Sequence, residues 1–215
     1  MSLHSHPPYS ASEEKLNIIT HALGLVMSFI AAGVLLVRAI RNSDHWQIAA
    51  VLVFGLSLIL LYSASTAYHS STDPIKRAKL RILDHVAIYG LIAGTYTPFA
   101  LVSLHGSLGW IVFGTVWGIA LIGAILKLLF TGRFKLLSTF LYIAMGWMGI
   151  LLFQSLQSQL STEGLVWMIA GGVAYSIGAL LYSIKRLPYN HALFHVFVLI
   201  GSACHVITIY YFVLK

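Results

Sequence analysis

Long apolar stretches, separated by short polar segments, recur along the whole chain of 215 residues. A run of about 20 apolar residues is long enough to cross the hydrocarbon core of a bilayer as an α-helix. The pattern predicts seven such helices, at 16–40, 46–68, 80–104, 108–130, 134–156, 165–184 and 191–214. These helices use nearly the whole chain and leave no room for a separate soluble domain.

The fold class predicted is therefore all-α: a polytopic membrane protein built as a seven-transmembrane helix bundle over residues 14–215. Residues 1–13 are polar, contain two prolines and are predicted to form a flexible cytoplasmic tail, in which His4 and His6 have no metal role. The composition agrees, since 59% of the residues are hydrophobic and 9% are charged. An average soluble domain has about 25% charged residues.

The net charge of +7 is explained by membrane topology rather than by a nucleic-acid partner. Arg38, Arg41 and Lys215 fall on one side of the predicted bundle. The other basic residues fall on the opposite side: Lys15, Lys76, Arg77, Lys79, Arg81, Lys127, Arg133, Lys135, Lys185 and Arg186. By the positive-inside rule, we predict a bacterial inner-membrane protein with its N-terminus in the cytoplasm and its C-terminus outside.

Polar residues converge at the cytoplasmic ends of three predicted helices. Asp84 is an acidic residue well inside an apolar stretch, which marks it as a candidate functional group. The sequence "STAYH" places Ser65 and His69 on one helix face, and "HALFH" does the same for His191 and His195. The alternating directions of the helices bring these five residues to the same membrane depth.

Three imidazoles with an open fourth position are typical of a catalytic zinc site, so we predict that His69, His191 and His195 bind Zn²⁺. The single Cys204 excludes a thiolate cluster. The alternative is that each histidine only forms hydrogen bonds between helices. Iron and manganese also accept imidazole and oxygen ligands, so the metal's identity stays open. Ser65 has an alternative role too, a hydrogen bond to its own helix backbone.

The first predicted helix carries Glu14, Asn17, Thr20 and His21 on one face of about 120° at the same end of the bundle. We predict that they support the site. The alternative is that Glu14 favours a helix N-terminus and the others join helices together.

Two other histidines are predicted to pack rather than to bind an ion. His205 lies ten residues beyond His195, about 15 Å along the helix, and is expected to form an interhelical hydrogen bond. His85 should point about 100° away from Asp84 around its helix. Small-xxx-small spacing predicts close helix packing at two glycine pairs: Gly90 with Gly94, and Gly114 with Gly118.

Four motifs together resemble the signature regions of the hemolysin III proteins, bacterial members of the PAQR group that also contains the adiponectin receptors. The motifs are "EKLNIITH" at 14–21, "STAYH" at 65–69, "LDH" at 83–85 and "HALFH" at 191–195. The resemblance implies a zinc ion held by His69, His191 and His195. It also implies a water near Asp84, with Ser65 close by.

Two functions remain open. The wider superfamily resembles alkaline ceramidases, which implies a zinc-dependent hydrolase of a lipid amide or ester at the cytoplasmic side, with membrane lipids and a lipid-like substrate or ligand as partners. Asp84 would then accept a proton and Ser65 would hold the water or an oxyanion. The alternative is a non-enzymatic receptor, membrane-homeostasis or pore-forming protein with a structural zinc ion. The oligomeric state is not predicted.

Overall fold

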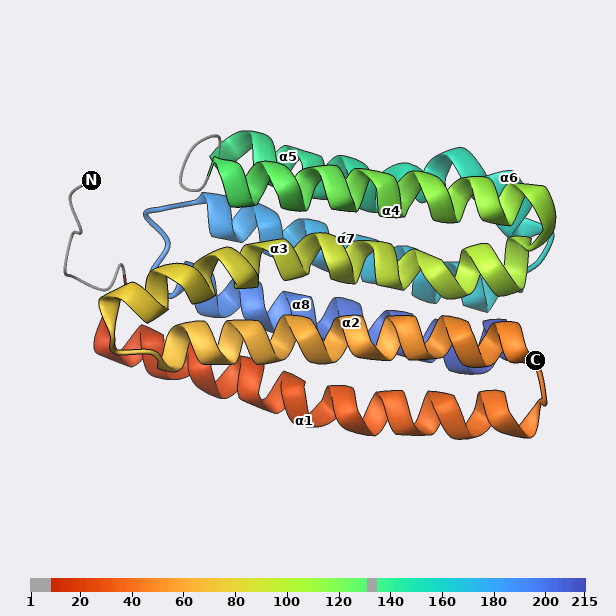
Figure 1. Ribbon diagram of the computed structural model, residues 1–215, viewed down its shortest axis with the longest axis horizontal. Coiled ribbons are helices and arrows are strands. Elements are labelled where there is room, and N and C mark those ends of the chain that lie inside the picture. Colours follow the sequence, from red (N-terminus) through yellow and green to blue (C-terminus); the bar gives the residue numbers. More distant parts are fainter. Residues whose placement is uncertain (1–8, 131–134) are drawn as a thin grey trace.

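The computed structural model, which describes residues 9–130 and 135–215, is a bundle of long helices that run back and forth along one axis (Figure 1). In chain order the elements are α1 Ala11–Arg41, α2 His45–Ser70, α3 Pro74–Pro98 with η1 Phe99–Leu104, α4 Gly106–Leu129, α5 Lys135–Gly146 with η2 Trp147–Leu152 and α6 Phe153–Gln157, α7 Thr162–Ser183, and α8 Asn190–Thr208 with η3 Ile209–Val213. Within the described residues, seven helices are long and apolar enough to span a membrane. The predicted fold class is confirmed.

Side-chain caps carry two helices beyond their apolar stretches. The Ser10 hydroxyl accepts a hydrogen bond from the Glu13 backbone N–H, so α1 starts at Ala11. Asp73 accepts hydrogen bonds from two backbone N–H groups at the start of α3, where Pro74 occupies the first turn. These extra turns matter because they place polar residues of α1 and α3 above the apolar part of the bundle. His4 and His6 lie outside the described residues.

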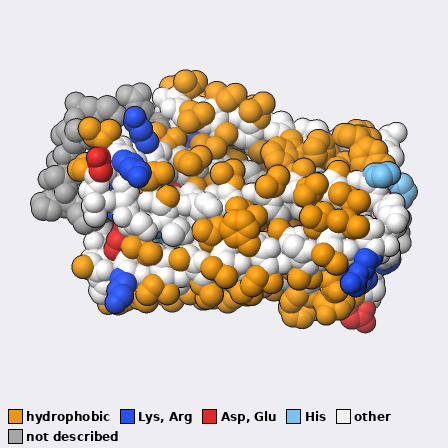
Figure 2. Space-filling view, turned by 60° about the horizontal axis from the view of Figure 1, so that its bottom comes forward, with side chains coloured by type: hydrophobic (Ala, Val, Ile, Leu, Met, Phe, Trp, Pro, Cys, Tyr) orange, Lys and Arg blue, Asp and Glu red, His pale blue; other side chains and the backbone are white. Residues whose placement is uncertain are grey.

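The surface of the bundle suits a lipid environment. Figure 2 shows hydrophobic side chains over the middle of the molecule, with Lys, Arg, Asp and Glu gathered towards its two ends. Large apolar side chains such as Leu56, Ile111 and Leu180 are more than half exposed on this surface. An apolar surface of this extent would be unfavourable in water, so the chain is a multi-pass membrane protein.

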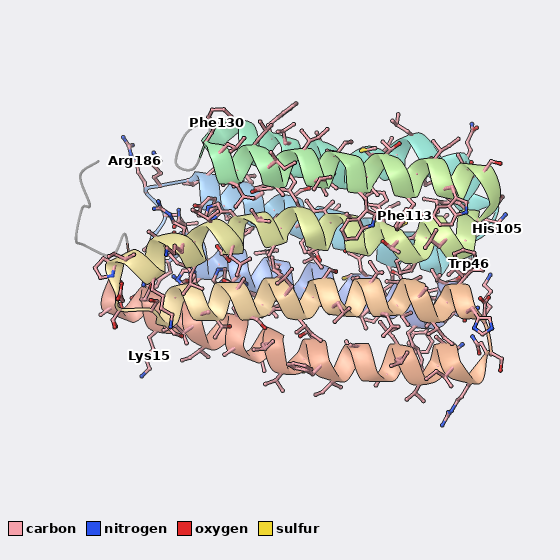
Figure 3. The ribbon with its side chains drawn as sticks, viewed as in Figure 1. Lys15, Trp46, His105, Phe113, Phe130 and Arg186 are labelled. Carbon is pink, nitrogen blue, oxygen red and sulfur yellow. The ribbon has the colours of Figure 1, made fainter. Side chains whose placement is uncertain are left out.

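The two ends of the bundle are named here for their contents. The site end carries the start of α1, the α2–α3 connection and the start of α8, while the far end carries the α1–α2 turn and the C-terminus (Figure 1). Lys15 and Arg186 lie at the site end, and Trp46 and His105 at the far end (Figure 3). This agrees with the predicted grouping of basic residues. Which end faces the cytoplasm stays a prediction.

Of the four glycines in the two predicted pairs, one lies at a close helix contact. A Cβ on Gly94 would lie 2.6 Å from the Ser57 Cβ of α2, so here the small residue does permit close approach. The prediction is wrong for its partner and for the second pair, because nothing lies within 4 Å of a Cβ on Gly90, Gly114 or Gly118. The spacing alone does not say which face of a helix meets a neighbour.

Candidate metal centre

Three histidines meet at the site end. His69 lies in the last turn of α2, and His191 and His195 lie in the first turns of α8. All three are buried, and one ring nitrogen of each lies within 4.8 Å of the others. The Nε2 atoms of His69 and His191 are 3.1 Å apart. Two nitrogens bound at about 2.0–2.1 Å to one tetrahedral zinc would lie about 3.3 Å apart, so the donor set fits such an ion.

The outer nitrogen of His69 is held by a carboxylate. Its Nδ1 lies 3.2 Å from Glu14 Oε2 of α1, and the other carboxylate oxygen accepts a hydrogen bond from Arg77 of α3. Since an ionised carboxylate only accepts, Nδ1 of His69 carries the proton. The Nε2 lone pair is therefore directed to the cluster. A histidine whose second nitrogen donates to a carboxylate is a common arrangement at metal sites.

The outer nitrogen of His195 also has partners on α1. Its Nδ1 lies 3.3 Å from the Asn17 carbonyl oxygen and 3.2 Å from Thr20 Oγ1. The carbonyl can only accept, and the Thr20 hydroxyl already donates to Leu16 O. Both partners therefore assign the proton to Nδ1, and the Nε2 atom of His195 is left as a ligand.

His191 has a different outer partner, Tyr9, which precedes α1. The Tyr9 hydroxyl lies 3.1 Å from His191 Nδ1 and can donate to it or accept from it. Burial raises the pKa of Tyr9, so the group stays a hydroxyl at neutral pH. The Glu13 carboxylate accepts a hydrogen bond from the His191 backbone N–H at the start of α8. These contacts dock the residues just before and within the first turn of α1 on α8.

Asp84 and Ser65 lie beside this cluster. Asp84 is buried on α3 and lines the same cavity as His191 and His195, and the Ser65 hydroxyl of α2 lies near its carboxyl group but forms no hydrogen bond of standard geometry within the described residues. His85 Nδ1 lies 3.5 Å from Asp84 Oδ2. The same Nδ1 donates to the Arg81 carbonyl oxygen one turn earlier, at 2.6 Å, so the His85 ring packs against its own helix beside Asp84.

His21 of α1 lies against the metal cluster and contacts it through its ring. Its ring stacks on His195 with centroids 3.4 Å apart, and meets Tyr62 edge-on. Among the described residues neither ring nitrogen of His21 has a hydrogen-bond partner, and the Asn17 Oδ1 atom also lacks one. Buried polar atoms of this kind are normally satisfied by water or a ligand. The supporting residues predicted on α1 are thus all brought to the cluster.

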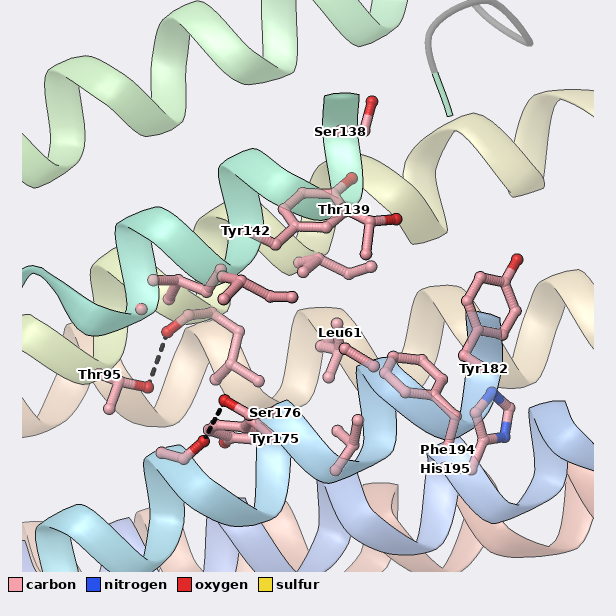
Figure 4. A pocket seen from close by; sticks show the side chains of 18 of the residues that line it. Leu61, Thr95, Ser138, Thr139, Tyr142, Tyr175, Ser176, Tyr182, Phe194 and His195 are labelled. Carbon is pink, nitrogen blue, oxygen red and sulfur yellow. Dashed lines mark hydrogen bonds between the residues drawn. The ribbon is translucent and has the colours of Figure 1, made fainter. Parts of the chain in front are cut away.

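A cavity of about 960 Å³ extends from the cluster into the bundle. Tyr9, Asp84, His191 and His195 line it at the site end. Further residues line it as it continues between the helices: Leu91, Phe99, Met168, Val198 and His205. Figure 4 shows Tyr142 of α5 across from Tyr182 of α7 and Phe194 of α8 in this space. The cavity is polar beside the histidines and largely apolar beyond them.

His205 lies apart from the metal cluster, as predicted. It stacks on Tyr175 of α7, with ring centroids 5.6 Å apart, and lines the cavity towards the far end. Its Nδ1 atom has no hydrogen-bond partner among the described residues. Packing against an aromatic ring therefore takes the place of a predicted hydrogen bond at that nitrogen.

Residues 9–206 match the family described as Haemolysin-III related. The chain belongs to this family. It is 42% identical to a hemolysin-3 homolog of Bacillus subtilis (strain 168), over 96% of this chain and 97% of the relative, and 42% identical to hemolysin-3 of Bacillus cereus, over 94% and 92%. An adiponectin receptor protein of Drosophila melanogaster is 26% identical over 88% of this chain, which spans about half of that receptor. The resemblance seen in the four motifs is confirmed.

Tyr9 and Arg77 are among the site residues that were not predicted from the sequence. Tyr9 belongs to a segment that was expected to be a tail, and its only sequence signal is its place next to the Ser10 cap. Arg77 was counted among the basic residues that set topology. No spacing rule links it to Glu14, because the two lie on different helices.

Proposed function

We propose that this member of the family is a zinc-dependent hydrolase that acts on a lipid amide or ester at the cytoplasmic side of the bacterial inner membrane. One observation supports this above the others. His191 and His195 line one end of a cavity of about 960 Å³ whose lining is largely apolar, and His69 lies next to both of them. Such a shape suits a molecule with a reactive polar group and a long apolar chain.

The substrate's apolar chain would lie along α8. Leu91, Phe99 and Val198 line that part of the cavity, and His205 lies about 15 Å beyond His195 along the helix. A chain placed there leaves its carbonyl group beside the histidines. Arg81 and Lys185 line the cavity at the site end, where a polar headgroup would remain close to the membrane surface.

The chemistry is divided among a few groups. When bound, a zinc ion supplies a Lewis acid that polarises a carbonyl oxygen. Asp84 accepts the proton of the attacking water, a role that its place on the cavity wall permits. Ser65, close to the Asp84 carboxyl, orients that water by hydrogen bonding. The apolar lining excludes bulk water from the reacting bond.

Asp84→Asn tests this proposal, because the amide keeps the shape of the carboxylate and cannot accept the proton. Zinc-loaded protein in detergent micelles is given a panel of long-chain N-acyl amides and acyl esters, and fatty acid release is measured. Loss of general-base catalysis is expected to lower the rate by about 100- to 10,000-fold. Zinc content, measured by elemental analysis, should stay at the wild-type level.

The matched control is Asp73→Asn, which changes an exposed carboxylate at the start of the same helix. Its rate should equal that of the wild type. An Asp84→Asn variant with full activity would refute the role of Asp84. A zinc-loaded wild type that releases no fatty acid from any member of the panel would refute the hydrolase proposal.

A second function is favoured by the way the site joins helices. The histidines come from α2 and α8, and their outer partners come from α1 and α3, so an ion here would tie four helices together at one end. A structural ion of this kind suits a receptor, homeostasis or pore-forming protein. It predicts a zinc-dependent rise in thermal stability with no lipid consumed, and for a pore, conductance in reconstituted bilayers.

A further inference from the structure

Arg77 of α3 contacts both α1 and the end of α2 at the site end. A residue that only sets membrane topology would not need such contacts. Its guanidinium donates to Glu14 Oε1 of α1 and to the carbonyl oxygens of His69 and Ser71, at 3.4 and 3.1 Å. The same group lies 4.8 Å from the centre of the Tyr68 ring. Arg77 is therefore fixed from several directions: it contacts the backbone of His69 directly, and its bond to Glu14 leads to the His69 imidazole.

Glu14 is the link between that guanidinium and the imidazole. One carboxylate oxygen faces Arg77 and the other lies 3.2 Å from His69 Nδ1. The side chains of Glu14 and Arg77 are only 14% and 17% exposed, and the His69 side chain is fully buried. Partial burial reduces solvent screening, so this pair is held more firmly than a surface ion pair.

We propose that Arg77 and Glu14 are a positioning pair for His69: Arg77 fixes the Glu14 carboxylate, which in turn holds the ring of His69 with its proton on Nδ1 and its Nε2 facing the metal. Neither residue supplies a ligand. The inference rests on the metal-binding part of the proposed function and is independent of whether a lipid is hydrolysed.

The proposal requires Arg77 to act through Glu14 rather than by a separate route. Without the guanidinium, the Glu14 carboxylate keeps a long hydrogen bond from the Asn17 amide, at 3.4 Å, and is held less firmly, so His69 loses a fixed acceptor. Without Glu14, Arg77 keeps its carbonyl and aromatic contacts but no longer reaches the imidazole. The two single losses should therefore have a common cause, and their combination should add little.

A double-mutant cycle on metal affinity tests this coupling. Cobalt(II) and zinc affinities of the full chain in detergent are measured by chelator competition for the wild type, Glu14→Ala, Arg77→Ala and the double variant. Each single change is expected to weaken binding by about 10- to 100-fold, as is usual for outer partners of metal ligands. The double variant should lie within about twofold of Glu14→Ala. Lys79→Ala, an exposed lysine of the same helix, is the matched control and should bind as the wild type does.

A second readout does not need the metal. NMR of the metal-free protein with nitrogen-labelled histidine reports which ring nitrogen of His69 carries the proton. The wild type should show the Nδ1–H form alone, and both alanine variants should show a mixture. Glu14→Gln and Arg77→Lys keep part of each contact and should give intermediate affinities, which separates positioning from misfolding.

Wild-type affinity in the Glu14→Ala and Arg77→Ala variants would overturn the proposal, as would two losses that multiply fully in the double variant. A wild type that binds no metal would overturn both this inference and the proposed function. A wild type that binds metal, shows the coupling and hydrolyses no lipid would refute only the hydrolase.

Discussion

The two ends of the helix bundle use polar side chains in different ways. At the site end, polar contacts converge on histidine rings, as the Glu14 carboxylate does on His69 and the Asn17 carbonyl on His195. At the far end, side chains hold backbone carbonyls of the C-terminal residues: Arg38 donates to Leu214 O at 2.9 Å, and Asn42 donates to Lys215 O at 3.1 Å. The contacts at the site end thus orient particular imidazoles, while those at the far end fasten the C-terminal backbone.

The difference has a physical consequence. Every residue carries a backbone carbonyl, so the far end needs a donor on α1 but no particular residue as its acceptor. The site end depends on particular side chains, because the nitrogens that its contacts orient belong to histidine rings. Changes at the site end should therefore alter metal binding, whereas changes at the far end should alter stability and leave metal binding intact.

The largest effect is expected from His195→Ala. Loss of one of three nitrogen ligands leaves two, which is too few for a typical zinc site. Elemental analysis of the purified protein should fall from about one zinc per chain to near none. His205→Ala is the matched control, since this third buried histidine of α8 lies outside the cluster. Equal zinc content in both variants would contradict the assignment.

A smaller effect, of another kind, is expected from Arg38→Ala at the far end. The substitution removes a charged donor to Leu214 O and the contact of the guanidinium with the Tyr210 ring. The free energy of unfolding in detergent should fall by about 1–2 kcal/mol, with zinc affinity unchanged. Arg41→Ala, an exposed neighbour, should show neither change. A loss of zinc in Arg38→Ala would mean that the two ends are not independent.

The smallest effect concerns the cap of α3 at the site end. Hydrogen bonds from the Lys76 and Ile75 backbone N–H groups lower the pKa of Asp73. Its contribution to stability is therefore present at neutral pH and is lost as the pH falls through the lowered pKa. Asp73→Asn caps the helix without titrating, so its melting temperature should depend less on pH in the acid range, by about 2 °C or less. A pH profile identical to that of the wild type would contradict this account.

Much of the site could be predicted because membrane topology restricts depth. Alternating helix directions place the end of α2 and the starts of α3 and α8 at one end, which brings His69, Asp84 and His191 to one level. A spacing of four residues then puts His195 on the same face. The prediction failed where helix rotation decides the contact, as for Gly90, Gly114 and Gly118, where an added Cβ would have nothing within 4 Å.

The sequence by itself determined the class of protein, the number of membrane helices and the set of histidines that share a depth, because hydrophobic length and helix periodicity are local properties. Only the tertiary structure decided which outer partner each histidine has. Tyr9, Glu14 and Thr20 reach three different rings because α1 packs between the end of α2 and the start of α8. Such contacts depend on helix rotation and side-chain direction, which no spacing along the chain specifies.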